Sequence, residues 1–456
     1  MQALHRDMAS VRPSAVAGMF YPRDARALAG ELDDLLGGVE HFAPRLGFPK
    51  ALVVPHAGYV YSGAVAARAY DELAPARGFA RRVVVLGPVH RVPVRGLAVP
   101  TCDAFETPLG RVPIDRAGVQ TALALPQVVE SDAAHAMEHS LEVQLPFLQK
   151  LLGEFSLVPF AVGMASVDEV AQVLERVWGG AETLVVVSTD LSHYHSYEQA
   201  RRIDGETLAR IARYACDIDH DEACGATPLN GLLSLAKKKS FAIKLLAACN
   251  SGDTAGGKDR VVGYSSFALY EDGGVSLDAA GRTLLGIARG AIESRLFGAG
   301  QEIGEAAWLK QAGASFVTLK KNATLRGCIG SLDALRPLGS DVAENAVGAA
   351  FRDPRFPALD PAEWPQCQVE VSLLSTAKPL RFADEADLLD QVLAGEDGLI
   401  LEAEGRRATF LPQVWESIAD KRMFLTELLR KAGLPEHTRL TRCKVSRYRV
   451  VKFDGR

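Results

Sequence analysis

The feature that most constrains this chain is a short apolar run that stops abruptly at ionisable side chains. Residues 184–188 read Leu-Val-Val-Val-Ser, and Asp190 and His193 follow directly. An unbroken apolar run rich in β-branched residues indicates a strand buried on both faces, because a half-exposed strand would alternate apolar and polar residues. Such strands are typical of open α/β folds, which place ligands at the carboxyl ends of their parallel strands. Asp190 and His193 are therefore candidates for a functional site.

Three other predicted strands end in the same way. His56 and His90 each follow a further apolar run, and Cys249 ends a third. Helical patterns separate these runs, and alternation of strands with helices favours a parallel sheet. We therefore expect an α/β domain with a parallel or mixed sheet flanked by helices. Its strand ends would bring these side chains together at one edge.

Imidazole, carboxylate and thiol groups are ligands for transition metals. If the strand ends converge, a metal site is expected from His56, His90, Asp190, His193 and Cys249. Two imidazoles with a carboxylate are typical of non-haem iron enzymes, whereas an added thiolate favours copper or zinc. His193 fits a ligand or an acid/base beside the metal. The alternative for each residue taken singly is an ordinary structural role.

Four further side chains are candidates for the pocket lining: Tyr59, Tyr194, His139 and Glu142. His139 and Glu142 lie three residues apart in a segment, 131–152, that contains a predicted helix, and this spacing equally fits a solvated helix face. We expect His135 and His195 to be packing or surface residues.

Composition excludes several classes of protein. The 456 residues are 48% hydrophobic and 23% charged, which is typical of a globular protein with more than one core. A net charge of −5 without a long basic run gives no support to a nucleic-acid partner. We find neither a signal peptide nor an apolar run near the roughly 20 residues that span a bilayer. Seven cysteines without a CxxC pair favour a reducing, cytoplasmic location over a secreted disulfide scaffold.

The segment Glu271-Asp272-Gly273-Gly274 indicates a linker, so we expect one domain over 1–272 and a second over 277–456. A long amphipathic helix followed by alternating strand patterns predicts that the second is a smaller α+β domain. Its densest motif, residues 325–330, carries Arg326 and Cys328 between glycines. The guanidinium could activate the thiol, although a buried structural cysteine is the favoured alternative.

Five of these motifs, in this order, resemble the Memo family. They are Pro55-His56-Ala57-Gly58-Tyr59, Gly87-Pro88-Val89-His90, Glu138-His139-Ser140-Leu141-Glu142, Ser188-Thr189-Asp190-Leu191-Ser192-His193-Tyr194 and Cys249-Asn250-Ser251-Gly252-Asp253. The resemblance covers about residues 10–272. It implies the fold of the class III extradiol dioxygenases, the LigB-like group, in which a non-haem iron sits at the strand ends.

Carried to this sequence, the resemblance implies that His56, His90 and Cys249 bind the metal, with Asp190 and His193 in the same pocket. Members of the family have been regarded both as redox-active copper or iron proteins and as scaffolds that bind phosphotyrosine peptides. Cys249 departs from an ordinary extradiol site, so ring cleavage does not follow from the resemblance.

The second half resembles the AMMECR domain over about residues 277–454. The motifs that carry this resemblance are 325–330, 351–356 and 411–415, which read Leu-Arg-Gly-Cys-Ile-Gly, Phe-Arg-Asp-Pro-Arg-Phe and Leu-Pro-Gln-Val-Trp. Fusion of the two domain types is similar to the AmmeMemoRadiSam system, whose third component is a radical SAM protein. The resemblance therefore implies such a protein as a partner.

The leading hypothesis is a metal-dependent, dioxygenase-like oxidoreductase that uses iron or copper on an unknown small-molecule or peptide substrate. His193 would shuttle a proton, and Asp190 would orient it or complete the coordination. Zinc-assisted hydrolysis with the same ligands is one alternative. A non-catalytic scaffold that binds a peptide or phosphopeptide is the other.

Overall fold

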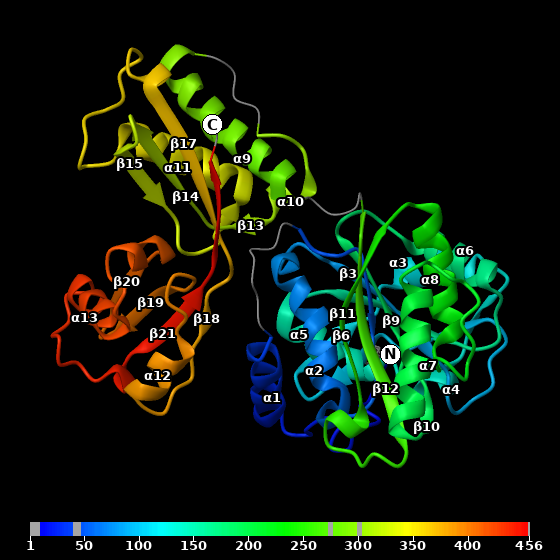
Figure 1. Cartoon of the computed structure of the whole chain (residues 1–456). Coiled ribbons are helices and arrows are strands. Elements are labelled where there is room, and N and C mark those ends of the chain that lie inside the picture. Colours follow the sequence, from blue (N-terminus) through cyan, green and yellow to red (C-terminus); the bar gives the residue numbers. More distant parts are fainter. Residues whose placement is uncertain (1–9, 40–46, 272–276, 299–302, 455–456) are drawn as a thin grey trace, which may run out of the picture. The chain divides into compact units, whose positions relative to one another are not determined.

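The computed structural model describes residues 10–39, 47–271, 277–298 and 303–454. Residues 10–39 and 48–271 belong to one compact unit, and the residues from 277 onward belong to another (Figure 1). The first unit is an α/β structure with a mixed sheet, and the second is built from smaller antiparallel sheets and helices. The fold class predicted from the sequence is confirmed.

A nine-stranded mixed sheet forms the centre of the first unit. Its central strands β2, β9, β3 and β8 run parallel in that order. Their bounds are Ala51–Val54, Thr183–Ser188, Arg82–Pro88 and Ser156–Val162. Every residue of β2 and β9 is buried, as their unbroken apolar runs predict. Because β2, β9 and β3 are neighbours, the segments that follow them meet at one edge of the sheet.

The remaining strands extend this sheet on both sides. β12 is antiparallel to β2, and β11 and β10 are antiparallel to β12. β4 and β7 lie beyond β8. The bounds are Leu97–Val99 for β4, Val128–Glu130 for β7, His193–His195 for β10, Ala242–Asn250 for β11 and Val261–Tyr270 for β12. β12 lies inside the sheet, and β11 pairs with β12 alone among the described strands.

Helices cover both faces of the sheet (Figure 1). α1, α2 and α5 pack on one face, and α3, α6, α7 and α8 pack on the other. Their bounds are Ala25–Gly37, Tyr59–Tyr70, Leu145–Leu152, Arg116–Leu123, Val167–Val177, Tyr197–Ile211 and Ala226–Lys238. Two faces covered by helices explain why the central strands are apolar throughout.

The segment 131–152 is not one helix. α4 (Asp132–Ala136) ends early, and a 3-10 turn at Glu142–Gln144 leads into α5. His139 lies in the irregular stretch between them. Strands β5 (Ala104–Thr107) and β6 (Gly110–Pro113) form a hairpin around Pro108, and β5 also pairs with β1 (Val11–Arg12).

The second unit contains two four-stranded sheets, in the orders β15-β14-β17-β22 and β18-β21-β19-β20. Helices α9 (Leu277–Phe297) and α11 (Leu338–Phe351) pack on the first of them. The strands of the two sheets are Thr324–Gly330, Ser315–Lys321, Cys367–Leu374 and Val450–Asp454, then Lys378–Pro379, Lys444–Tyr448, Gly398–Ala403 and Arg406–Phe410. The remaining elements are α10 (Ala307–Lys310), α12 (Glu385–Gln391), α13 (Lys421–Lys431) and the short pair β13 (Ala312–Gly313) and β16 (Arg336–Pro337).

No helix among the described residues has both the length and the apolar character that crossing a membrane requires.

Candidate metal centre

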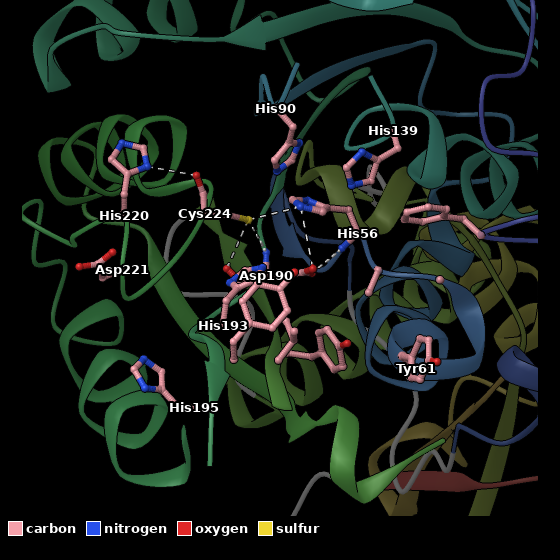
Figure 2. Close-up of a pocket in the computed structure, with 16 residues that line it drawn as sticks. His56, Tyr61, His90, His139, Asp190, His193, His195, His220, Asp221 and Cys224 are labelled. Carbon is pink, nitrogen blue, oxygen red and sulfur yellow. Dashed lines mark hydrogen bonds and ion pairs between the residues drawn. The ribbon is translucent and has the colours of Figure 1, made fainter. Parts of the chain in front are cut away.

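A cavity of about 830 Å³ opens at the edge of the sheet where β2, β9 and β3 end (Figure 2). Asp190 and Cys224 contribute to its wall, which also contains six histidines: His56, His90, His139, His193, His195 and His220. The strand order explains part of this set, because His56 follows β2, Asp190 follows β9 and His90 follows β3. Convergence of imidazole, carboxylate and thiol groups makes this cavity the candidate site.

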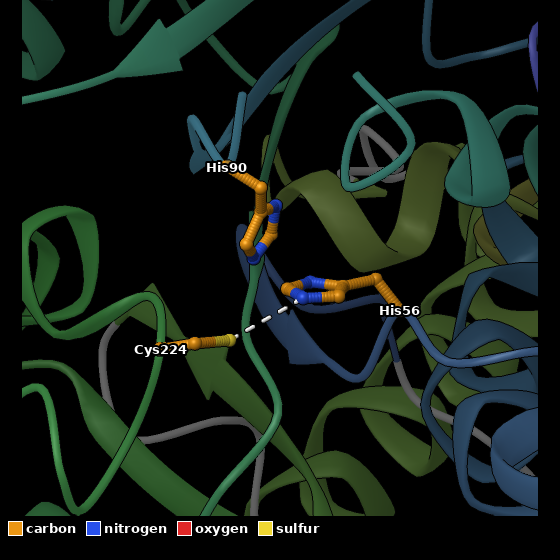
Figure 3. A group of neighbouring side chains, drawn as sticks. All are labelled: His56, His90 and Cys224. Atoms are coloured by element: carbon orange, nitrogen blue, oxygen red, sulfur yellow. Dashed lines mark hydrogen bonds between the residues drawn. The ribbon is translucent and has the colours of Figure 1, made fainter. Parts of the chain in front are cut away.

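Two imidazoles and a thiol meet in this cavity (Figure 3). His56, His90 and Cys224 each offer one donor atom, and these three atoms lie within 4.8 Å of one another. The Sγ of Cys224 is 3.3 Å from the Nε2 of His56. Two nitrogens and one sulfur at this separation form a donor set that suits a transition-metal ion.

The opposite edge of each imidazole is bound to the protein. The Nδ1 of His56 lies 2.8 Å from the Oγ of Ser188, and the Nδ1 of His90 lies 2.9 Å from Glu138 Oε1. Burial opposes ionisation of Glu138, but hydrogen bonds from His90 and from backbone N–H groups outweigh it and lower its pKa to about 2. His90 therefore donates from Nδ1 to a carboxylate, and its Nε2 remains available. Metal-binding histidines are usually oriented in this way.

Burial dominates the electrostatics of two of the donors, His56 and Cys224. Burial lowers the pKa of His56 well below its ordinary value, and the nearby His139 and His90 lower it further. Burial, reinforced by the charge of Asp190, raises the pKa of Cys224 to about 12. The imidazole and the thiol are thus both neutral in the metal-free protein. A bound cation would reverse this preference at the thiol, because metal binding favours the thiolate.

Asp190 and His193 lie beside the three donors. The backbone N–H of His56 donates to Asp190 Oδ1 at 2.8 Å, and Asp190 Oδ2 is 3.9 Å from His56 Nε2. Burial raises the pKa of Asp190 to about 7 and lowers that of His193. His139 completes the group, with its ring centroid 4.7 Å from that of His90, and burial lowers its pKa to about 4. These groups can hold or exchange a proton next to the donor atoms.

Cys224 occupies the position that the sequence motifs assign to Cys249. Among the described residues, Cys249 does not line the cavity. It lies near the end of β11, which β12 separates from β2, and neighbouring strands are about 4.8 Å apart. Burial raises its pKa to about 11. Cys249 therefore does not join His56 and His90, and the expectation that it does is corrected to Cys224.

Cys224 comes from the loop that precedes α8, so no strand pattern points to it. Its N–H donates to the Asp190 carbonyl at 3.3 Å, and the Gly225 N–H donates to Thr189 Oγ1 at 2.9 Å. A Cβ at Gly225 would stand 2.6 Å from the Ser188 carbonyl oxygen. The signal available in the sequence is this Cys-Gly pair just before a helix, since only glycine permits so close an approach to the strand end.

Glu142 and Tyr59 are structural residues, and neither lines the cavity. Glu142 is fully buried and forms an ion pair with Arg12 at 2.6 Å. The hydroxyl of Tyr59 donates to the Val143 carbonyl at 2.8 Å. The solvated helix face considered for His139 and Glu142 is also wrong, because His139 has only 18% of its side chain exposed.

Tyr194, His195 and His135 are the remaining residues of the first unit for which the sequence predicts a role. Tyr194 lines the mouth of the cavity, 64% exposed, and the Arg260 guanidinium lies 5.0 Å from its ring centre. His195, expected as a packing or surface residue, lines the cavity, and His220 was missed. His135 is a packing residue as expected, with its Nε2 3.0 Å from the Ala98 carbonyl.

The candidate pair of the second unit lies on β15. Arg326 is buried and donates to Glu363 at 2.9 Å, and Cys328 accepts a hydrogen bond from the Thr318 hydroxyl at 3.3 Å. These contacts give both side chains structural partners within that unit.

The model of the Memo-like proteins matches residues 12–268, more than half of the sequence. The chain belongs to the Memo family. The AMMECR1 model matches residues 285–453, so the two units described above correspond to the two family matches.

Two relatives named as MEMO1 family proteins agree with the assignment to the Memo family. A MEMO1 family protein of Aquifex aeolicus is 37% identical over 270 residues, which cover 56% of this chain and 97% of that protein. Another from Methanobrevibacter smithii is 32% identical over 284 residues, covering 56% and 98%. Among solved structures, an uncharacterized protein of Pyrococcus horikoshii is 33% identical, with a TM-score of 0.36, and covers 38% of this chain and 90% of that one.

Proposed function

We propose that this Memo family protein is a metal-dependent oxidoreductase whose ion, copper or iron, is bound by His56, His90 and Cys224. The observation that carries the proposal is the approach of their three donor atoms to within 4.8 Å of one another in the wall of an open cavity. His56 is buried and Cys224 partly buried, whereas the His90 side chain is 31% exposed, so the three donor atoms gather where an ion can reach them from the cavity.

The donor set limits the choice of ion. A thiolate is a soft ligand, and with two imidazoles it suits copper or zinc. Iron becomes the better candidate if Asp190, whose Oδ2 lies 3.9 Å from His56 Nε2, contributes its carboxylate. The bound metal would supply redox chemistry, which zinc does not.

The surrounding residues suit proton transfer and binding of an organic substrate. His193 and His139 are neutral near pH 7, because burial lowers both pKa values, so either can accept a proton. Phe20, Tyr61 and Tyr264 add aromatic surface to the wall. A cavity of about 830 Å³ is of the size that holds a small organic molecule. A radical SAM protein as partner stays a prediction.

The test is metal analysis of protein purified without oxygen, followed by measurement of oxygen uptake. We expect copper or iron near one equivalent in the wild type, with oxygen uptake that His56→Ala abolishes. Cys224→Ser should lower metal content strongly, whereas the matched variant Cys249→Ser should retain it.

Three results would contradict the proposal. Zinc alone, with no oxygen uptake, would favour hydrolysis by the same ligands. No metal under any condition would favour a binding scaffold. Equal losses in the two cysteine variants would refute the assignment of Cys224.

A further inference from the structure

A buried network of neutral groups holds the side of His56 that faces away from the cavity. Ser188, the last residue of β9, lies 2.8 Å from His56 Nδ1. Gln144 and Tyr70 continue the network into the interior. None of these three side chains reaches solvent: Gln144 has 1% of its surface exposed, and Ser188 and Tyr70 have none. Their hydrogen atoms must therefore be distributed among the partners present.

The orientation of the Gln144 amide follows from its neighbours. Its Oε1 accepts the Tyr70 hydroxyl at 2.8 Å. Its Nε2 donates to the Pro55 carbonyl at 3.0 Å and to Ser188 Oγ at 2.9 Å. A reversed amide would set its oxygen against the Pro55 carbonyl oxygen, so only one orientation satisfies all partners.

The hydroxyl of Ser188 has one hydrogen, and the Ser140 carbonyl is its acceptor at 2.7 Å. One lone pair of Oγ accepts from Gln144, and the other faces His56 Nδ1. The hydrogen between His56 and Ser188 must then be on Nδ1. In the other tautomer, the Ser188 hydroxyl would donate to His56 Nδ1 instead of the Ser140 carbonyl. Among the described residues, that buried oxygen would then keep only a 3.4 Å contact with Gln144 Nε2.

We infer that Ser188, oriented by Gln144, is a positioning residue that keeps the proton of His56 on Nδ1 and directs the lone pair of Nε2 toward Cys224. Glu138 does the same for His90, whose side chain is 31% exposed against 2% for His56. The partner of His56 Nδ1 is thus a neutral hydroxyl, whereas the partner of His90 Nδ1 is a carboxylate. The tautomer stands independently, and only its consequence for metal binding rests on the proposed function.

The tautomer can be measured in the metal-free protein by long-range proton–nitrogen NMR of protein labelled in its histidines, with His56→Asn to assign the signal. We expect the Nδ1–H form of His56 in the wild type. Ser188→Ala should shift His56 to the Nε2–H form or to a mixture. The matched control is Ser265→Ala, because Ser265 is a fully buried serine of β12 whose hydroxyl has no partner among the described residues. It should leave the His56 signal unchanged.

Titration with Co²⁺ gives the second readout, through the thiolate-to-metal absorption band. Ser188→Ala should weaken Co²⁺ binding by about 10- to 100-fold, the usual effect of removing a partner of a metal-binding histidine. Ser265→Ala should bind as the wild type does. If Ser188→Ala does not fold, Gln144→Leu is the substitute variant, because it keeps Ser188 but removes the amide that orients it. In Gln144→Leu we expect a measurable population of His56 in the Nε2–H form.

The outcomes separate the two ideas. An Nε2–H form in the wild type, or an unchanged tautomer in both the Ser188 and Gln144 variants, overturns the inference. An Nδ1–H form that responds to Ser188→Ala in a protein that binds no metal supports the inference about the tautomer and refutes the proposed function.

Discussion

Replacing Glu142 with glutamine should destabilise the first unit strongly without removing the metal site. Glu142 is fully buried and accepts four hydrogen bonds: from Arg12 Nη1 at 2.6 Å, the Ala15 N–H at 2.8 Å, the Val16 N–H at 3.0 Å and the Tyr21 hydroxyl at 2.6 Å. These four donors use every lone pair of the carboxylate. They tie the N-terminal segment to the residues that precede α5.

The magnitude follows from what Glu142→Gln leaves behind. One oxygen becomes an NH₂ group that faces two donors, and Arg12, only 6% exposed, loses its ion pair. Breaking a buried ion pair by removing one partner costs about 3–5 kcal/mol. That is a large part of the 5–15 kcal/mol that typically stabilises a domain. An exposed pair in the same unit, Glu106 with Arg111 at 3.6 Å, provides the matched control.

The assay is urea unfolding monitored by hydrogen exchange. Only peptides from the first unit are measured, so that the second unit does not contribute to the signal. We expect a loss of about 3–5 kcal/mol for Glu142→Gln and less than about 1 kcal/mol for Glu106→Gln. The folded fraction of Glu142→Gln should bind metal with unchanged stoichiometry, since Glu142 does not line the cavity. Equal losses in the two variants would refute the reasoning from burial.

Three further predictions concern other parts of the chain. Burial lowers the pKa of His135 to about 4, whereas an unfolded histidine has a pKa of about 6.5. Between these two pH values the folded protein therefore binds fewer protons than the unfolded chain. Stability should fall on the order of 3 kcal/mol as the pH drops from about 6.5 to 4, and His135→Gln should reduce that slope in urea midpoints. Asn322 and Ala323 form the turn between β14 and β15 with φ of 51° and 63°, so Ala323→Gly should stabilise the second unit by about 1 kcal/mol in the same assay; an unchanged midpoint would contradict this. Gly225→Ala should weaken Co²⁺ binding about tenfold or more by displacing the neighbouring thiol, whereas Gly257→Ala, with nothing within 4 Å, should not.

Much of the site could be predicted because its residues lie at the ends of buried strands. His56, His90 and Asp190 each come directly after a buried parallel strand, and the unbroken apolar runs that reveal such strands are local features. His193, which follows shortly after Asp190, also lines the cavity. The fold class followed from the same pattern, since strands that alternate with helices form a covered sheet.

The wrong predictions concern residues whose positions depend on how the chain runs between helices and strands. Helical spacing suggested that His139 and Glu142 share a helix face, but an irregular stretch separates α4 from α5. As a result, His139 lines the cavity, whereas Glu142 forms an ion pair with Arg12. Cys249 does end a strand, as predicted, yet that strand joins the sheet beyond β12. Strand pairing over long sequence separations leaves no periodic signal in the chain.

The sequence by itself determined that three strands end at His56, His90 and Asp190, because local apolar runs reveal buried strands and their ends. Only the tertiary structure decided which thiol meets these residues. Cys224 stands 168 residues from His56 in the chain, and its Sγ lies 3.3 Å from the imidazole. That contact depends on how the loop before α8 packs against the end of β9, where Gly225 allows backbone atoms to come close. Packing of this kind is a property of the folded molecule, because it is set by the shapes of two segments that are distant in sequence.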